Sequence, residues 1–236
     1  VRRRTAAAGV DGITPSAYQD GLDERLERLS SALRAGRWQP APLVRLRQRK
    51  PGGGLRRLAI PTVEDRIVIE GIRRCVEPDI EARLSVAAHA YRPGRSARSA
   101  VEVVTRRIEE GARWVALADI REFFDSIVHG ELAKELGEIP CEAEVRGLLD
   151  RLLAGHALRP GQGLPQGSAL SPALSNLALR GMDRALLDEG YGLVRYCDNL
   201  CVTAREQGTA RAALAAMHRE ARARGLTLKP EASRVV

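Results

Sequence analysis

The stretch RYCDNLCVTA, residues 195–204, places an aspartate and an asparagine between two short apolar runs. This pattern predicts a β-hairpin over 191–204, with the carboxylate of Asp198 at its tip. Asp-Asn is also ordinary turn chemistry, so a purely structural role for Asp198 stays open on these residues alone.

A second acid follows a different apolar run, WVALADI at 114–120. The run predicts a buried strand with Asp119 at its C-terminal end. If this strand lies beside the hairpin, Asp119 and Asp198 converge at one edge of a sheet. Two carboxylates at close range repel each other unless a divalent cation lies between them, and Mg²⁺ prefers such ligands together with phosphates. The spacing alone is compatible with a magnesium site for phosphoryl transfer, but it favours the alternative of a turn aspartate.

The rest of the chain alternates helical and strand-like segments. Apolar spacing predicts helices at 22–35, 65–78 (closed by Pro78), 101–111, 142–154, 170–188 and 206–224, with strands on both sides of the turn at 51–54 and a last strand within 226–236. Helices interleaved with a few non-adjacent strands indicate an α+β fold.

The composition and the net charge indicate which kinds of partner this protein is expected to bind. The 236 residues are 44% hydrophobic, enough for one domain or two joined lobes, and the net charge of +8 favours polyanions such as nucleic acid or an anionic membrane face. A soluble protein that is merely rich in arginine is the plain alternative. Aromatic residues are only 3% of the chain, which argues against a single-strand binder built on base stacking.

Neither the cysteines nor the hydropathy pattern indicates another class of functional site. The four cysteines have no CxxC spacing, so a zinc site or a disulfide framework is not expected. No run of 18 apolar residues occurs, and the start VRRRTAAAG lacks an apolar signal core. We therefore expect a cytoplasmic protein with no membrane partner.

Two glycine-rich turns carry further candidate residues. Lys50, Arg56 and Arg57 flank the first turn and could close on a triphosphate, although charged hairpin edges also simply prevent aggregation. The second, GQGLPQGSALSPALSN at 161–176, precedes a helix, and such a turn lets a nucleotide approach the backbone closely.

Taken in order, these segments resemble a reverse transcriptase, most closely the group II intron-like bacterial lineage. The matching segments are GVDG (9–12), KPGGGLRRLAIPTVEDR (50–66), AYRPGRSARSA (90–100), WVALADIREFFDSIVH (114–129), GLPQGSALSPALSNLAL (163–179), RYCDN (195–199) and GLTLKPEAS (225–233). Each is modest evidence alone, but seven collinear matches over nearly the whole chain are specific.

The resemblance implies a right-hand polymerase fold with fingers at 1–88, including an N-terminal extension, and a palm at 89–236 with returning fingers helices. The palm would hold a small antiparallel sheet packed by helices, and no thumb is expected in this chain. Further domains or a protein partner would then supply the thumb function. The implied activity is RNA-directed DNA polymerase: transfer of a nucleotide from a dNTP to the 3′-hydroxyl of a DNA or RNA primer on an RNA template.

The resemblance also implies residue roles. Asp119, the Ile120 carbonyl and Asp198 would hold Mg²⁺, with Mn²⁺ as an alternative cofactor. Phe124 lies where the family has a steric gate against the ribose 2′-hydroxyl. The implied nucleotide-binding residues are Lys50, Arg56, Glu122, Phe123, Phe124, Gln166 and Gly167, and the implied template-binding residues are Arg92 and Arg95.

Asn199 departs from the family pattern, which usually has a second aspartate there. An amide keeps one oxygen ligand but removes a negative charge, so metal affinity should fall. Two hypotheses follow: a polymerase with a weakened or manganese-tolerant site, with Asn199 in its catalytic turn, or an inactive nucleic-acid-binding scaffold in a phage-defence or CRISPR-associated system. A nucleotidyl cyclase is a third, less favoured reading of the same palm. Lys229, in the last motif, is a candidate general acid.

Overall fold

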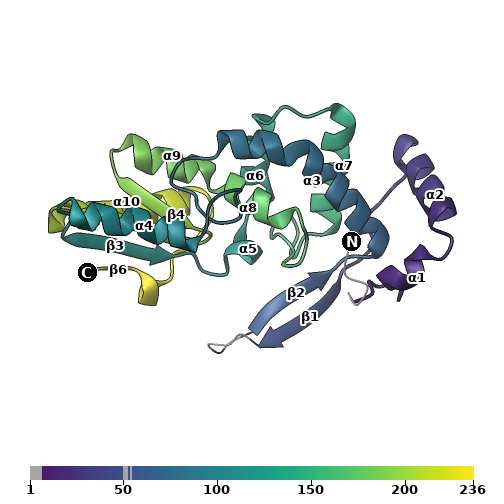
Figure 1. Cartoon of the computed structure of the whole chain (residues 1–236), viewed down its shortest axis with the longest axis horizontal. Coiled ribbons are helices and arrows are strands. Elements are labelled where there is room, and N and C mark those ends of the chain that lie inside the picture. Colours follow the sequence, from purple (N-terminus) through teal and green to yellow (C-terminus); the bar gives the residue numbers. More distant parts are fainter. Residues whose placement is uncertain (1–6, 50–52, 54) are drawn as a thin grey trace. The chain divides into compact units, whose positions relative to one another are not determined.

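The computed structural model describes residues 7–49, 53 and 55–236. The chain forms two compact units, each made of two separate segments (Figure 1). Unit 1 comprises 1–77 and 141–171, and unit 2 comprises 78–140 and 172–236. Helices and antiparallel strands occur together in both units, so the predicted α+β class is confirmed.

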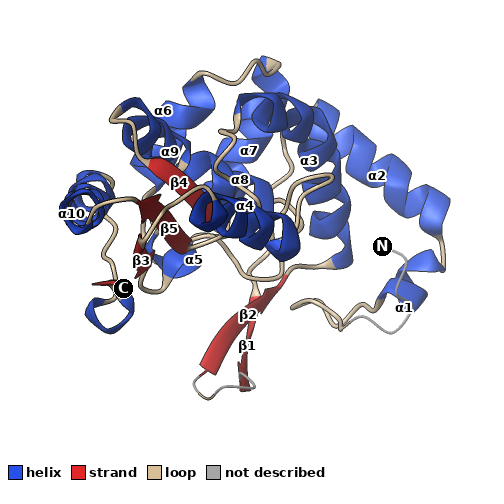
Figure 2. Ribbon diagram, turned by 60° about the vertical axis from the view of Figure 1, so that its left-hand side comes forward, coloured by secondary structure: helices blue, strands red, loops and turns tan. Residues whose placement is uncertain are grey.

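Unit 1 combines helices with one two-stranded hairpin. Its elements are α1 (Pro15–Gln19), α2 (Leu22–Arg34), β1 (Val44–Arg49), β2 (Leu55–Ile60), the first part of α3 (Val63–Arg83) and α7 (Ala143–Gly155). Strands β1 and β2 pair antiparallel, and both views show this hairpin extending away from the helices of unit 1 (Figures 1 and 2).

Buried polar groups anchor the segment that leads into this hairpin. The backbone N–H of Ala41 donates to Oδ2 of Asp65 at 3.0 Å, and the Ala41 carbonyl lies 3.1 Å from Nε2 of His156. Both side chains are nearly fully buried, and burial raises the pKa of Asp65 while it lowers the pKa of His156. Both backbone groups of one residue, Ala41, are therefore held just before β1 begins.

Unit 2 is built on a four-stranded antiparallel sheet of order β4-β5-β3-β6. The strands are β3 (Trp114–Asp119), β4 (Gly192–Tyr196), β5 (Asn199–Ala204) and β6 (Arg234–Val235). The helices are α4 (Ala97–Glu109), α5 (Phe123–Ser126), α6 (His129–Gly137), α8 (Ser171–Ala178, with its first residue in unit 1), α9 (Arg180–Asp188) and α10 (Gln207–Ala223).

Helix α10 covers one face of this sheet and packs on β3 and β5. Its buried positions are mostly alanine, for example Ala213 and Ala216, each 0% exposed. Small side chains let the helix backbone approach the strands closely, and Ala116 and Val202 fill the sheet side of the contact. This packing forms the apolar core of unit 2.

A buried arginine joins the sheet to two helices. Arg195 of β4 is 0% exposed, and its Nε and Nη2 each donate to a carboxylate oxygen of Asp183 at 2.7 Å. Its Nη1 donates to Oδ1 of Asn176 and to the carbonyl of Cys197, both at 3.0 Å. Ser85 donates to the same Asp183 carboxylate at 3.0 Å. The charge is therefore paired and well supplied with hydrogen bonds, as a buried ion requires.

Two predictions about segment boundaries were wrong. Helix α3 does not end at Pro78 but continues to Arg83. Pro78 is exposed, whereas Ile72, Val76 and Ile80 on the opposite side are at most 3% exposed. The continuous apolar stripe therefore holds the helix across the hydrogen bond that proline removes.

The predicted helix 170–188 is two helices, broken at Leu179. This break brings Asn176 of α8 and Asp183 of α9 to the same guanidinium group. The last short strand predicted within 226–236 is confirmed as β6, and a 3₁₀ turn (Pro230–Ala232) separates it from the bridge Ile120↔Leu228.

Among the residues that the structure describes, no helix is both long enough and apolar enough to cross a membrane. Three short helices, α1, α5 and α6, had not been predicted from the sequence.

We expect Asp183→Ala to lower the free energy of unfolding by about 3–5 kcal/mol, because it leaves the buried Arg195 charge unpaired. The matched control is Glu102→Ala, which breaks the exposed Arg98–Glu102 pair and should cost about 1 kcal/mol or less. Urea unfolding followed by circular dichroism measures both. Equal losses in the two variants would contradict the structural role given to Arg195.

Candidate functional site

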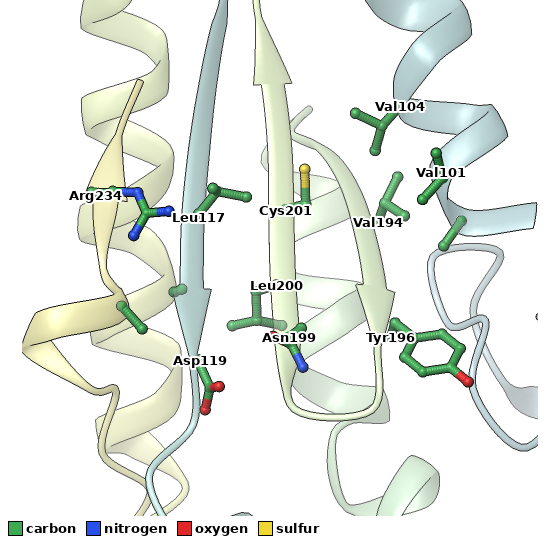
Figure 3. A pocket seen from close by; sticks show the side chains of 13 residues that line it. Val101, Val104, Leu117, Asp119, Val194, Tyr196, Asn199, Leu200, Cys201 and Arg234 are labelled. Carbon is green, nitrogen blue, oxygen red and sulfur yellow. The ribbon is translucent and has the colours of Figure 1, made fainter. Parts of the chain in front are cut away.

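The two predicted acids lie at the same end of the unit 2 sheet. Asp119 is the last residue of β3 and is paired in register with Asn199, the first residue of β5. Asp198 directly precedes that pair, and the backbone N–H of Ile120 donates to its carbonyl at 3.1 Å. Figure 3 shows Asp119 and Asn199 side by side at this sheet edge. The predicted convergence of two distant acids is therefore present in the backbone geometry.

A two-residue turn, Cys197–Asp198, joins β4 to β5. Cys197 has φ 58°, a left-handed conformation that is costly for a residue with a side chain. The bond from Arg195 to the Cys197 carbonyl holds it there. The thiol is 9% exposed and lies 3.6 Å from the hydroxyl of Tyr91. Burial, with a smaller effect of the Asp198 charge, raises the pKa of Cys197 to about 11, so the thiol stays protonated.

The acids are close enough to influence each other's charge. Burial raises the pKa of Asp198 first, and the negative charge of Asp119 raises it further, while Lys229 lowers it. The Lys229 ammonium lies 2.7 Å from Oδ1 of Asp119, an oxygen that has no contact with solvent. Asn199 donates from Nδ2 to Oδ1 of Asp198 at 3.3 Å. The edge thus holds two carboxylates, one amide and one ammonium group.

This donor set fits a hard divalent cation. Carboxylate and amide oxygens are the ligands that Mg²⁺ accepts, and a cation would relieve the repulsion that raises the pKa of Asp198. Across the described part of the chain, no group of three or more His, Cys, Asp or Glu side chains gathers as a metal site. With Asn199 in the turn, the set at this edge remains two acids and an amide.

The residues after Asp119 form a tight corner. Glu122 has φ 45° and begins the short helix α5, where Phe123 is 3% exposed and Phe124 is half-buried. The two rings meet edge to face with centroids 5.5 Å apart. Phe123 therefore fixes the corner in the core, and Phe124 is the ring left partly accessible.

Gln166 and Gly167 lie against strand β2 within unit 1. The Gln166 carbonyl accepts from the backbone N–H of Ala59 at 2.8 Å. Gly167 has φ 123°, and a Cβ on it would be 2.7 Å from the Ala59 carbonyl oxygen, so only glycine fits. The structure thus packs the PQG turn on the strand that contains Arg56, whose backbone pairs with Gln48. Lys50 lies outside the described residues.

The two arginines predicted to contact the template are engaged inside unit 2. The Arg92 side chain is 7% exposed, pairs with Glu81 at 2.7 Å and donates to the Ser85 carbonyl at 2.6 Å. Arg95 donates to the carbonyl of Val86 at 2.6 Å. These bonds fix residues 85–88. This segment lies beside the β4–β5 hairpin, because Ala88 forms a β-bridge with Arg195 of β4. A template contact by either arginine stays a prediction, and the geometry supports a role in holding this loop.

The sequence reasoning did not predict the residues that support the turn: Asn176, Asp183 and Tyr91. A charged residue inside the apolar strand GLVRY was a usable signal, because a buried arginine requires an acid within the fold. Nothing in the spacing showed which acid would pair with it.

Solved structures define the class of fold. A telomerase structure from Candida albicans matches 94% of this chain and 48% of its own, with TM-score 0.63 and 11% sequence identity. A telomerase structure from Candida tropicalis matches 90% of this chain with TM-score 0.61 and 11% identity. The fold is that of a right-hand polymerase.

Sequence comparison defines the family. Residues 48–236 match the family described as Reverse transcriptase (RNA-dependent DNA polymerase), and the chain belongs to this family. Protein YkfC of Escherichia coli is 33% identical over 188 residues, which are 75% of this chain and 49% of YkfC. The group II intron-encoded protein LtrA of Lactococcus lactis is 29% identical over 187 residues, 76% of this chain and 31% of LtrA. The predicted group II intron-like lineage is confirmed, and the chain spans about half or less of these relatives.

We expect Asp198→Asn to stabilise the metal-free protein at neutral pH. The raised pKa of Asp198 means that ionisation costs folding free energy, and this cost is present above the folded pKa and disappears as pH falls and the carboxyl is protonated. The amide has no such cost. Thermal unfolding should therefore show a higher midpoint for the variant at pH 7, with the difference shrinking toward pH 4.

Adding Mg²⁺ should reverse the order, because only the wild-type edge keeps both carboxylates for the cation. A variant that is no more stable than wild type at pH 7 without metal would contradict the repulsion inferred at this edge.

Proposed function

We propose that this chain is the catalytic part of an RNA-directed DNA polymerase, which transfers a nucleotide from a dNTP to a primer 3′-hydroxyl on an RNA template. The observation that carries the proposal is the meeting of Asp119 and Asp198 at one sheet edge, with Ile120 hydrogen-bonded to the Asp198 carbonyl. Membership of the reverse transcriptase family supports the choice of reaction.

In this proposal the residues of unit 2 bind and orient the reacting groups. Asp119, Asp198 and the Ile120 carbonyl hold the divalent ions, with the Asn199 amide as a weaker oxygen donor. When bound, Mg²⁺ or Mn²⁺ lowers the pKa of the attacking hydroxyl and neutralises charge on the phosphates. The left-handed Cys197 and the buried Arg195 keep the Asp198 backbone in place while the substrate changes.

The proposal also assigns residues to the nucleotide. Arg56 and Lys50 neutralise the triphosphate, since a guanidinium fork matches phosphate oxygens. The backbone N–H groups of Glu122 and Phe123 face the triphosphate, and Gln166 and Gly167 contact the sugar of the nucleotide. The half-buried Phe124 ring excludes a 2′-hydroxyl and so selects deoxynucleotides.

Lys229 places an ammonium group beside the proposed metal-binding edge. Its ammonium group lies 2.7 Å from Asp119, and its backbone N–H donates to the Asp119 carbonyl at 2.8 Å. We assign it the role of general acid that protonates the pyrophosphate leaving group. Cation binding at Asp119 would release the ammonium group from the carboxylate.

The second candidate function is a nucleic-acid-binding scaffold without synthesis, and Asn199 is the observation that favours it. An amide at this position removes one negative charge from the cation site. Such a protein would keep the fold and bind RNA, and would fail to extend a primer. Both candidate functions therefore include RNA binding, and only the polymerase also extends a primer.

Asp119→Ala should lower primer extension by about a hundredfold or more, the scale of losing one group that stabilises charge in the transition state. The assay measures dNTP incorporation on an RNA template by the full-length natural protein, with Mg²⁺ and with Mn²⁺ in parallel. The matched control is Asp188→Ala, which removes an exposed acid at the end of α9. No incorporation by the wild-type protein with either metal would overturn the polymerase proposal.

Asn199→Asp should lower the Mg²⁺ concentration for half-maximal extension by about tenfold, because it adds a carboxylate worth about 1.4 kcal/mol to the cation site. A metal titration of the extension rate measures this change. If the wild-type protein is inactive and Asn199→Asp extends the primer, the scaffold candidate gains support for the natural protein. If the variant changes neither metal affinity nor rate, lost charge at this position does not limit the reaction.

A further inference from the structure

The β1–β2 hairpin of unit 1 displays a row of arginines that the proposed chemistry does not use. Arg45, Arg47 and Arg49 alternate along β1 in the sequence VRLRQR, and all three side chains are exposed. Alternate residues of a strand point to the same face and are about 6.6–6.8 Å apart. The three guanidinium groups therefore form one charged line on a single face of the hairpin.

The pairing of β1 with β2 places a fourth arginine on that face. Arg57 of β2 pairs directly with Arg47, and directly opposed residues lie on the same side of an antiparallel ladder. Arg56 belongs to the intervening row, opposite Gln48. Arg56, the residue that the proposed function assigns to the triphosphate, is therefore not part of the row formed by Arg45, Arg47 and Arg49.

Arg45, Arg47 and Arg49 of β1 lack an acidic partner among the residues that the structure describes. Within the described residues, no carboxylate lies at ion-pair distance from Arg45, Arg47 or Arg49. Elsewhere in unit 1, Arg73 and Arg74 both pair with Glu70, so an arginine of this unit forms an ion pair where an acid lies next to it. Like charges in a row repel, and an anionic ligand that bridges them would relieve this repulsion.

The base of the hairpin is fixed while its arginine row is exposed. Ala41, before β1, is held by Asp65 and His156, and Ala59, near the end of β2, is held by Gln166. The row therefore projects from an anchored base. Binding of a ligand to this row therefore costs the hairpin backbone little additional conformational entropy.

We propose that Arg45, Arg47 and Arg49 bind the sugar–phosphate backbone of a nucleic-acid strand, as a site separate from the metal-binding edge and from the triphosphate ligands. A polyanionic strand offers repeated phosphates to repeated guanidinium forks. A membrane surface fits less well, since the alternate face carries only Leu46 as a large exposed apolar residue beside Gln48. The inference rests on the proposed function only in taking a nucleic acid as the ligand.

The test compares the wild-type protein with the triple variant Arg45→Gln, Arg47→Gln, Arg49→Gln. Binding to a labelled single-stranded RNA and to an RNA–DNA duplex is measured by fluorescence anisotropy, without dNTP or divalent metal, over a range of salt concentrations. The affinity should fall at least about tenfold at low salt. The slope of log affinity against log salt should become shallower by about two to three, because three phosphate contacts are lost.

The matched control removes three exposed arginines of unit 2: Arg113→Gln, Arg184→Gln and Arg211→Gln. It lowers the net charge equally, so a similar loss of RNA affinity in this control would overturn the proposal in favour of overall charge. Unchanged RNA binding in the hairpin variant would also overturn it, and aggregation of that variant alone would then assign the arginines to protection of the strand edges. Loss of binding to anionic phospholipid vesicles with RNA binding intact would assign the row to a membrane surface.

A fourth variant, Arg45→Lys with Arg47→Lys and Arg49→Lys, keeps the charge and removes the fork. Partial retention of RNA affinity is expected, because lysine binds phosphate as a point charge. The Asp119→Ala variant should bind RNA like the wild type in the same assay. Failure of synthesis is therefore distinguishable from failure of this binding site.

Discussion

Unit 2 depends on the ion pair between Arg195 and Asp183. Both side chains are 0% exposed, and two parallel hydrogen bonds of 2.7 Å join them. A buried pair of this kind adds little net stability compared with an apolar pair, but it tolerates no missing partner. Its geometric effect is larger: one guanidinium group ties β4, α8, α9 and the Cys197 carbonyl to a single point. The turn that carries Asp198 is thus held in place by a guanidinium group that is fully buried.

The same ion pair explains why a strained turn persists next to the acids. Cys197 and Tyr91 are both left-handed, at φ 58° and 59°, and their side chains meet at 3.6 Å. Neither residue is glycine, so each conformation costs free energy that the surrounding contacts must offset. Arg195 supports both sides, since its backbone also bonds to Ala87 and His89 just before Tyr91. Cys197 and Tyr91 therefore both lie beside the hydrogen bonds that Arg195 makes through its side chain and its backbone.

The local pattern of apolar residues predicted the strands that form this site. It did not predict which strands, or which side chains, pair with each other across the fold. The apolar run before Asp119 predicted one strand, and the runs around Asp198 predicted a hairpin. All three strands exist, with Asp119 at the end of β3 and Asp198 in the turn between β4 and β5. That β3 and β5 are neighbours, with Asp119 opposite Asn199, was only a condition in the sequence argument. Pro78 misled the prediction because a proline ends a helix only when no tertiary packing holds the next turn. The pairing of Arg195 with Asp183 was invisible because many acids in the chain have similar local surroundings.

Charge balance at the sheet edge links the stability of this protein to its proposed chemistry. Asp119 and Asp198 bring two negative charges together, and Lys229 supplies one positive charge at 2.7 Å. An aspartate at 199 would add a third negative charge to the metal-free state, and part of that repulsion would be paid in folding free energy. Asn199 avoids this cost and keeps a hydrogen bond to Asp198, so the metal-free edge is less strained. The same substitution weakens attraction for a cation, because a divalent ion gains most where repulsion between its ligands is greatest. In the proposed metal site, asparagine at this position would therefore exchange metal affinity for stability of the metal-free fold.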